Sequence, residues 1–392
     1  MRLYEYEAKK ILPSRGIAVP RGQVLSPGEK IDTSRPGVLK AQVLSGGRQK
    51  AGGVVIVSGP DQIADTVQAL FQKPIHGLPV TKIIWEEFIE VEREFFLGAI
   101  YDSSRKSPLV FFSPEGGVEV ELLTEKDPGR LFYRDFDILQ GFSEYQAREL
   151  IAEAGLQGSE LLKISDILYR MVSLFLDLDA TILEINPLAQ TKDGNYIALD
   201  CHIDIDDDAL YRHKELETQF GILKREGGGG RQVTELERQA AAIDNLDHRG
   251  VAGRVIEFDG NLALLIGGGG ASLAAFDAIR RHGGRPANYC EIGGNPTVLK
   301  VKELTKLLLS KPGVEKIAVI MNVVSNTRVD LVARGVIKGV LELGRDPAKT
   351  IAVFRIPGAW EEEGYKILAR YGVPYCGRTV SIDEAAKEAV SS

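Results

Sequence analysis

A lysine inside an apolar run and the glycine-rich segment after it could together hold phosphate groups. The run 38–44 carries Lys40 and leads into the segment 46–53, which contains Gly47, Arg48, Gln49 and Lys50. Glycines let the main chain approach phosphate oxygens, and cationic side chains supply the opposite charge. The segment lacks the GxxxxGK[ST] spacing of a P-loop. The pattern therefore predicts either a phosphate-binding loop or a solvated basic turn.

A second group of residues could bind a divalent cation. Asn186 follows Glu184 in an apolar run, and Asp200 ends a second run after the turn at 191–195. A β-hairpin of this length would bring the side chains of Asn186 and Asp200 together. One carboxylate and one amide oxygen are ligands that Mg²⁺ accepts, with phosphate oxygens and water completing an octahedron. Taken alone, the segment is also compatible with a hairpin that merely has polar ends.

The composition indicates an ordinary globular protein and narrows the classes of partner. The 392 residues have a net charge of −7, which argues against nucleic acid as the main partner. Three separate cysteines predict neither a disulfide framework nor a zinc site. The first residues lack the apolar core of a signal peptide, and no apolar run reaches the length of a membrane span. We expect a cytoplasmic protein that does not bind membranes.

The chain divides into two blocks around a run of four glycines. We predict a first domain at 1–225, a flexible glycine-rich linker at 226–240 and a second domain at 241–392. In the second domain, apolar runs at 261–266, 316–321 and 350–355 alternate with helical patterns. Such alternation is typical of a parallel, doubly wound α/β sheet.

Six segments, in the same order and at similar spacing, resemble the β subunit of succinyl-CoA synthetase, a member of the ATP-grasp superfamily. They are residues 4–9, 46–53, 94–98, 115–119, 184–188 and 282–288. The resemblance extends over nearly the whole chain. It implies an N-terminal ATP-grasp domain followed by a flavodoxin-like CoA-ligase domain.

The resemblance also implies roles for individual residues. Lys40 matches a lysine that contacts nucleotide phosphate, and Gly47, Arg48 and Gln49 match the loop over the nucleotide, where the family usually has glycine at Gln49. Glu86 and Glu94 match acidic positions that hold adenosine and ribose. Asn186 and Asp200 match the magnesium ligands. Glu184 matches a carboxylate that faces the phosphohistidine of a partner subunit.

The same resemblance implies a reaction and a partner. ATP phosphorylates a histidine, the phosphoryl group passes to a carboxylate, and the CoA thiol attacks the acyl phosphate. The histidine belongs to an α-type subunit, which also binds most of the CoA, so we expect a heterodimer or a heterotetramer. We expect structural or solvent-exposed roles for the chain's own histidines, which are His76, His202, His213, His248 and His282.

The second domain departs from the succinyl-CoA synthetase pattern in three loops expected to contact the acid. The candidate substrate residues are Gly267 and Gly268, Asn295, Asn326, Thr327 and Arg328, together with Arg355 at a predicted strand end. These loops are similar to those of ATP-citrate lyase and citryl-CoA synthetase. Extra side-chain donors would suit an acid with more carboxylate and hydroxyl groups. Succinate is the first expectation, and citrate or malate is the alternative.

Two other functions are compatible with parts of this pattern. A non-catalytic nucleotide-sensing subunit could keep the fold, although it would need neither Glu184 nor the metal pair. An unrelated ATP-grasp carboxylate–amine ligase would lack the second α/β domain. ATP rather than GTP is the expected nucleotide.

Overall fold

The computed structural model describes residues 1–31, 35–117, 128–225 and 233–392, which form two compact units, Met1–Gln232 and Val233–Ser392. Two sequence features lie partly or wholly outside the described residues. They are the end of the motif at 115–119 and the glycine run at 227–230. None of the helices in the described ranges is long and apolar enough to cross a membrane.

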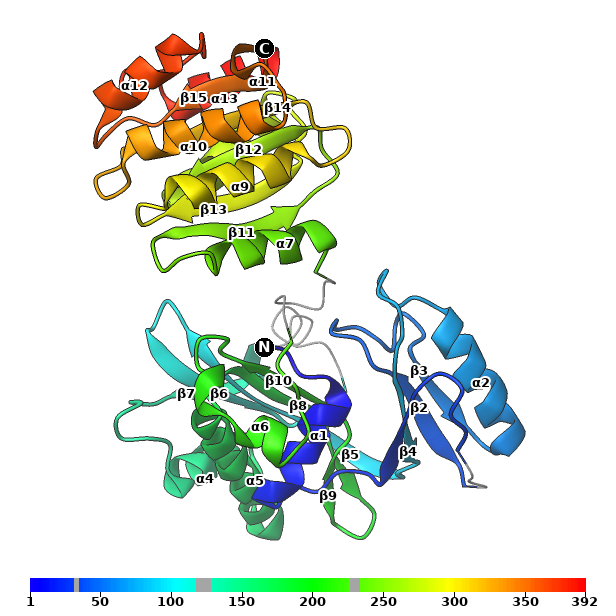
Figure 1. Cartoon of the computed structure of the whole chain (residues 1–392). Helices are drawn as coiled ribbons and strands as arrows, with labels where there is room; N and C mark the ends of the chain where they lie inside the picture. Colours follow the sequence, from blue (N-terminus) through cyan, green and yellow to red (C-terminus); the bar gives the residue numbers. More distant parts are fainter. Residues whose placement is uncertain (32–34, 118–127, 226–232) are drawn as a thin grey trace. The chain divides into compact units, whose positions relative to one another are not determined.

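The first unit begins with a helix and a small four-stranded sheet (Figure 1). The sheet has the antiparallel order β1-β4-β2-β3, and helix α2 packs against it. Lys40 lies on β2, and the glycine loop connects β2 to β3. The elements are α1 (Glu5–Ile11), η1 (Leu12–Arg15), β1 (Gly22–Leu25), β2 (Gly37–Ala41), β3 (Val54–Val57), α2 (Pro60–Gln72) and β4 (Ile83–Glu87).

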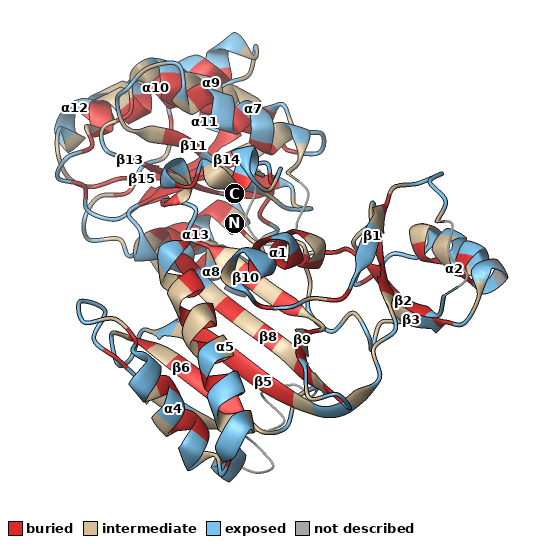
Figure 2. Cartoon of the chain, turned by 90° about the horizontal axis from the view of Figure 1, so that it is seen from below, coloured by how far each residue is buried: buried red, intermediate tan, exposed pale blue. Residues whose placement is uncertain are grey.

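A larger antiparallel sheet follows, with the order β10-β8-β5-β6-β7 and β9 paired to β8. Helix α5 lies across β5 and β8, and α4 packs beside it (Figure 2). Apolar residues of α5 recur at helical spacing, so one face is buried against the sheet. The elements are β5 (Val91–Asp102), β6 (Ser107–Ser113), η2 (Pro128–Arg130), β7 (Phe132–Asp135), α4 (Glu144–Glu153), α5 (Gly158–Asp177), β8 (Ala180–Thr191), β9 (Tyr196–Ala198), β10 (Cys201–Ile205), η3 (Leu210–Arg212) and α6 (Glu215–Thr218).

Side chains along β8 and β10 point alternately into the core and toward the opposite face of the sheet. On β8, Leu183 and Ile185 are fully buried, whereas Glu184 between them is only partly buried. On β10, Cys201 and Ile203 are buried, and His202 is partly exposed. Successive strand residues point to opposite faces, so the polar residues of both strands share the face away from α5.

The second unit contains the predicted parallel sheet. Strands β12, β14 and β15 pair in parallel in that order, with helices packed around them. The sequence prediction did not include an antiparallel pair, β11 with β13, beside this sheet. The elements are α7 (Glu235–Asp244), β11 (Val251–Glu257), β12 (Leu262–Gly267), α8 (Gly270–Arg281), β13 (Asn288–Gly293), α9 (Val298–Leu309), β14 (Lys316–Met321), α10 (Val329–Glu342), α11 (Pro347–Thr350), β15 (Ile351–Arg355), α12 (Glu361–Arg370) and α13 (Ile382–Ser391).

Main-chain hydrogen bonds join Leu262 on β12 to Arg285 and Ala287 just before β13, and a side chain continues the connection further along the strands. Asn288 accepts a hydrogen bond from the Leu264 N–H (2.9 Å) and donates one to the Leu264 carbonyl (2.8 Å). Both residues are buried. The amide therefore attaches the antiparallel pair to the parallel sheet.

Helix α7 occupies the second half of the segment predicted as linker at 226–240. Thr234 is its N-cap, and the Thr234 and Glu237 side chains each accept a hydrogen bond from the other's main-chain N–H, which satisfies two free donors of the first turn. Ala240 and Ile243 are buried, so one face of α7 packs into the second unit. The sequence analysis predicted a linker and no helix here, although Thr234 and Glu237 have the spacing of a capping box.

Candidate functional site

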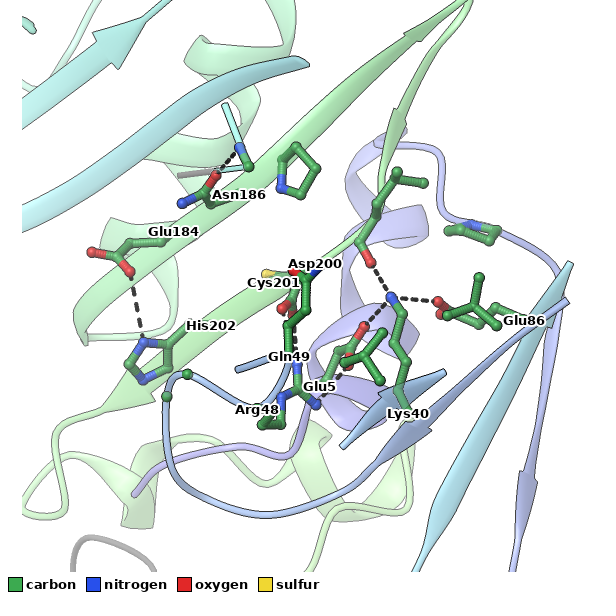
Figure 3. A pocket seen from close by; sticks show the side chains of 18 of the residues that line it. Glu5, Lys40, Arg48, Gln49, Glu86, Glu184, Asn186, Asp200, Cys201 and His202 are labelled. Carbon is green, nitrogen blue, oxygen red and sulfur yellow. Dashed lines mark hydrogen bonds and ion pairs between the residues drawn. The ribbon is translucent and has the colours of Figure 1, made fainter. Parts of the chain in front are cut away.

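A cleft of about 1200 Å³ lies within the first unit, between residues of the small sheet and residues of the large one. All nine residues that the sequence assigned to the nucleotide, the metal and the partner histidine line it: Lys40, Gly47, Arg48, Gln49, Glu86, Glu94, Glu184, Asn186 and Asp200. Most of them appear in Figure 3. Residues more than 150 positions apart in the sequence thus meet at one site.

The hairpin predicted to join Asn186 and Asp200 is present. Leu188 pairs with Ala198 across β8 and β9, and the Asn186 N–H donates to the Asp200 carbonyl (3.2 Å). The Asn186 Oδ1 accepts a hydrogen bond from the Gly117 N–H (2.8 Å). Both carboxylate oxygens of Asp200 accept hydrogen bonds from the Arg48 guanidinium. The donor set is one carboxylate and one amide oxygen, which fits Mg²⁺ carried by a polyphosphate.

Glu5 on α1 is the centre of a buried ion cluster at one wall of the cleft. Its Oε1 lies 2.6 Å from the Lys9 Nζ and 2.8 Å from the Lys40 Nζ, and its Oε2 lies 2.7 Å from the Arg48 Nη1. Burial alone would raise the pKa of Glu5, but Lys40, Lys9 and Arg48 outweigh it and hold that pKa well below its usual value. Burial alone would lower the pKa of Lys40, but the charges of Glu5 and Glu86 outweigh burial and raise that pKa above its usual value. The cluster therefore fixes two cations of the cleft in their charged forms.

The structure gives Glu86 a different position from the one expected for a ribose ligand. It is 2% exposed, and its two oxygens are paired with the ammonium groups of Lys9 and Lys40. A hydrogen bond that Glu86 accepts from a ribose hydroxyl would compete with both pairs. Glu86 therefore serves to hold Lys40 in place.

Glu94 is the acidic residue that remains available to a ligand. It is partly buried, and it has no ion-pair partner in the described part of the chain. Burial raises the pKa of its carboxyl group. Gly117, at φ +71°, passes so close that a Cβ there would lie 2.2 Å from the Glu94 Oε2. Only glycine allows this approach.

The sequence analysis did not identify His202 as part of this site. His202 lines the cleft and lies directly opposite Glu184 in the pairing of β10 with β8. The sequence signal was its position two residues after Asp200, because alternation along a strand places both side chains on the same face.

In the second unit, the candidate substrate residues lie at the carboxyl ends of neighbouring strands. Gly267 ends β12, Asn295 follows β13, residues 326–328 follow β14, and Arg355 ends β15. The Asn295 N–H donates to the Thr327 Oγ1 (3.3 Å), and the Arg328 N–H donates to the Asn295 Oδ1 (3.3 Å). The loops after β13 and β14 are therefore joined. In open α/β sheets, this edge is where ligands bind.

The glycine loop after β12 already holds an internal carboxylate. The N–H groups of Gly268 and Gly269 donate to the Glu291 Oε1, at 3.0 and 2.8 Å. Burial raises the pKa of Glu291, but the nearby Ser272 hydroxyl and the hydrogen bond from the Gly269 N–H outweigh that effect and lower it. A substrate carboxylate at Gly268, as the sequence predicted, would have to compete with Glu291.

The two candidate arginines of this edge are also engaged within the chain. Arg328 forms two hydrogen bonds with Asp330, at 3.0 and 2.8 Å, and its guanidinium lies 4.0 Å from the ring centroid of Trp360. Arg355 is buried and donates to the main-chain carbonyls of Met321 and Val380. The contact with the substrate acid that the sequence predicted for Arg355 would require these bonds to break.

Comparison with known proteins agrees with this architecture. Residues 2–190 match the ATP-grasp domain family, and residues 231–368 match the family described as ATP citrate lyase citrate-binding. The succinate–CoA ligase [ADP-forming] subunit beta of Methanocaldococcus jannaschii is 35% identical over 394 residues, which cover 100% of this chain and 99% of that protein. The subunit of the same name from Aquifex aeolicus is 34% identical over 390 residues and covers 96% and 94%.

A solved structure supports the fold across the whole chain. ATP citrate lyase from Methanothrix soehngenii, in complex with citrate and coenzyme A, aligns with a TM-score of 0.77 and 19% identity over 100% of this chain and 99% of that one. The predicted ATP-grasp domain and the α/β domain after it are confirmed.

Proposed function

Because the chain belongs to the family of ADP-forming succinate–CoA ligase β subunits, we propose that it is the nucleotide-binding subunit of an acid–thiol ligase. The reaction would convert ATP, a carboxylic acid and CoA into ADP, phosphate and an acyl-CoA. The observation that carries the proposal is the gathering of all nine motif residues around one cleft. A chance resemblance in sequence would not bring residues of β2, β5, β8 and the loops at 46–49 and 199–200 to one place.

The residues of this cleft would act mainly by positioning and charge, as phosphoryl transfer requires. Lys40 and Arg48 would contact phosphate oxygens, with their charge maintained by Glu5. Asn186 and Asp200 would hold Mg²⁺, which when bound neutralises phosphate charge. Glu94 would accept a hydrogen bond from a ribose hydroxyl.

The reaction needs a second subunit, which we propose is an α-type chain that carries the phosphohistidine and most of the CoA site. Glu184 would face that histidine and orient its imidazole. The relatives are themselves described as β subunits, which supports this division of labour. A heterodimer or heterotetramer in the cytoplasm is the assembly that we propose.

Succinate is the acid that the relatives favour, since their names specify succinate. Citrate is the second candidate, and a separate observation favours it: residues 231–368 match a citrate-binding family model. The polar loop at 325–328 and Asn295 add donors at the substrate edge, which an acid with a hydroxyl and a third carboxylate could use.

The test is an assay of the chain co-expressed with its α-type partner. CoA-dependent ADP formation is measured with ATP and Mg²⁺ and one acid at a time: succinate, citrate, malate and acetate. Activity with succinate identifies a succinate–CoA ligase, whereas activity with citrate or malate shows that the altered loops specify the acid. ADP formation with an amine acceptor and without CoA would instead identify a carboxylate–amine ligase, and no turnover with any acid would favour a non-catalytic subunit.

A further inference from the structure

His202 and Glu184 face each other across two paired strands in the nucleotide cleft. The His202 Nδ1 lies 3.8 Å from the Glu184 Oε2, and the side chains are 33% and 31% exposed (Figure 3). Glu184 therefore lies on the Nδ1 side of the ring. This leaves Nε2 as the ring nitrogen available for another contact.

The Nε2 atom of His202 is buried and has no hydrogen-bond partner among the described residues. An unpaired nitrogen in a buried position is unfavourable, because it has lost water and gained no replacement. His213 shows the usual solution, with Nδ1 bonded to Glu215 and Nε2 to Asp179. The orphan nitrogen of His202 thus indicates that a hydrogen-bond partner from outside the chain belongs beside it.

The surroundings of His202 indicate what that partner is. Asp200 lies two residues earlier on the same face, and Asn186 pairs with the Asp200 main chain. The loop that carries Arg48 passes beside His202 (Figure 3). A cation-binding pair, an arginine and a glycine-rich loop are the environment of a polyphosphate end rather than of a nucleobase.

We propose that His202 binds the terminal phosphoryl group of the nucleotide through Nε2–H while Glu184 orients the ring at Nδ1. This inference rests on the proposed function and adds a phosphate ligand to it. A phosphate oxygen would satisfy the orphan nitrogen by accepting a hydrogen bond from Nε2–H. The contact would raise the affinity for ATP but not for ADP, because ADP lacks the terminal phosphate.

Two substitutions separate this role from a structural one. In His202→Gln, the side-chain amide nitrogen can approximate the position of Nε2, whereas in His202→Asn it can reach only the position of Nδ1. The control is His248→Gln, an exposed histidine of the second unit. Each full-length variant is titrated calorimetrically with the non-hydrolysable ATP analogue AMPPNP and with ADP, both in Mg²⁺.

In His202→Asn, the affinity for AMPPNP should be about tenfold lower than in the wild type, because one charge-assisted hydrogen bond is lost. The affinity of this variant for ADP should stay within about twofold of the wild-type value. His202→Gln should recover most of the loss, and the control should match the wild type. Equal weakening for both nucleotides, or no change, would overturn the proposal.

A labelling experiment tests the remaining alternative, in which His202 is itself phosphorylated. The chain alone is incubated with [γ-³²P]ATP, and acid-labile label is sought. Label that His202→Gln abolishes would overturn the ligand role in favour of an acceptor role, whereas its absence agrees with the proposal. If the wild-type chain binds neither nucleotide, the proposed function itself fails, which is distinct from a selective failure at His202.

Discussion

The guanidinium of Arg48 contacts both carboxylate oxygens of Asp200, with its Nη2 3.0 Å from Oδ1 and 2.9 Å from Oδ2. Asp200 is the carboxylate proposed to hold Mg²⁺. Arg48 also pairs with Glu5, so one arginine connects the proposed metal position to the buried cluster behind it. A bound metal ion and Arg48 would therefore compete for Asp200 unless phosphate oxygens take over the guanidinium.

This relationship predicts the behaviour of Asp200→Asn. Removing the charge should lower turnover of the complex with its α-type partner on the order of a hundredfold, because the metal would lose its carboxylate ligand. Assembly with the partner should persist, since the Asp200 side chain is 41% exposed and is not part of a core cluster. Steady-state kinetics and size-exclusion chromatography measure the two effects. Unchanged turnover would refute the magnesium assignment.

The cluster around Glu5 predicts a loss of stability in Glu5→Gln. Three cations would lose a buried carboxylate, so the free energy of unfolding should fall by about 3–5 kcal/mol. Chemical denaturation followed by circular dichroism measures it. The control is Glu90→Gln, which removes an exposed pair with Lys192 and should change the stability by less than about 0.5 kcal/mol.

The same cluster predicts a pH dependence with a definite sign. The pKa of Glu5 is lowered on folding, so its contribution is present above its unfolded pKa, near the ordinary value of 4.5, and is lost as the pH falls toward the folded value. The stability difference between wild type and Glu5→Gln should therefore be constant near neutral pH and shrink below about pH 4.5. Denaturation curves across pH 3–8 test this, and a difference that grows on acidification would contradict it.

The contrast between two acidic residues of the cleft gives a further prediction. Glu94→Gln should weaken ATP and ADP binding equally, by about tenfold, with little loss of stability, because its carboxylate has no ionic partner in the described residues. Glu86→Gln should mainly destabilise the chain, since it breaks the pairs with Lys9 and Lys40. Calorimetric binding and thermal unfolding distinguish the two. A reversal of these effects would return the ribose role to Glu86.

In the second unit, at the carboxyl ends of the strands, Glu291→Gln tests whether the carboxylate of Glu291 holds the glycine loop after β12 in place. Replacing the charged acceptor weakens the bonds from Gly268 and Gly269, each charge-assisted and stronger than a neutral bond. We expect a loss of about 1–2 kcal/mol in stability and a raised KM for the acid, with the KM for ATP unchanged. An unchanged KM for the acid would remove this loop from the substrate site.

Much of the site could be predicted from the sequence because its residues belong to motifs of fixed spacing. The hairpin between Asn186 and Asp200 followed from two apolar runs and a turn, and the parallel strands β12, β14 and β15 followed from their apolar runs. In both cases, local pattern and short-range connection determine the outcome.

The pairings between distant residues could not be predicted in this way. Glu86 on β4 meets Lys9 on α1 only through the tertiary fold, and nothing near either residue in the sequence indicates the pair. Arg355 at a strand end suggested a ligand, but its two carbonyl partners come from β14 and from the segment before α13. The antiparallel pair of β11 and β13 was missed because β12 and α8 lie between the two strands in the sequence, so no local turn marks the pairing.

The central claim is that this chain supplies the nucleotide site from which a partner's histidine is phosphorylated. The most direct measurement incubates the purified α-type partner with [γ-³²P]ATP and Mg²⁺, with and without this chain, and follows acid-labile label on the partner. The account predicts label only when this chain is present, its loss on addition of CoA and the acid, and an initial rate of labelling about a hundredfold lower with Asp200→Asn. Label that forms without this chain, or no label with wild-type chain, would contradict the account.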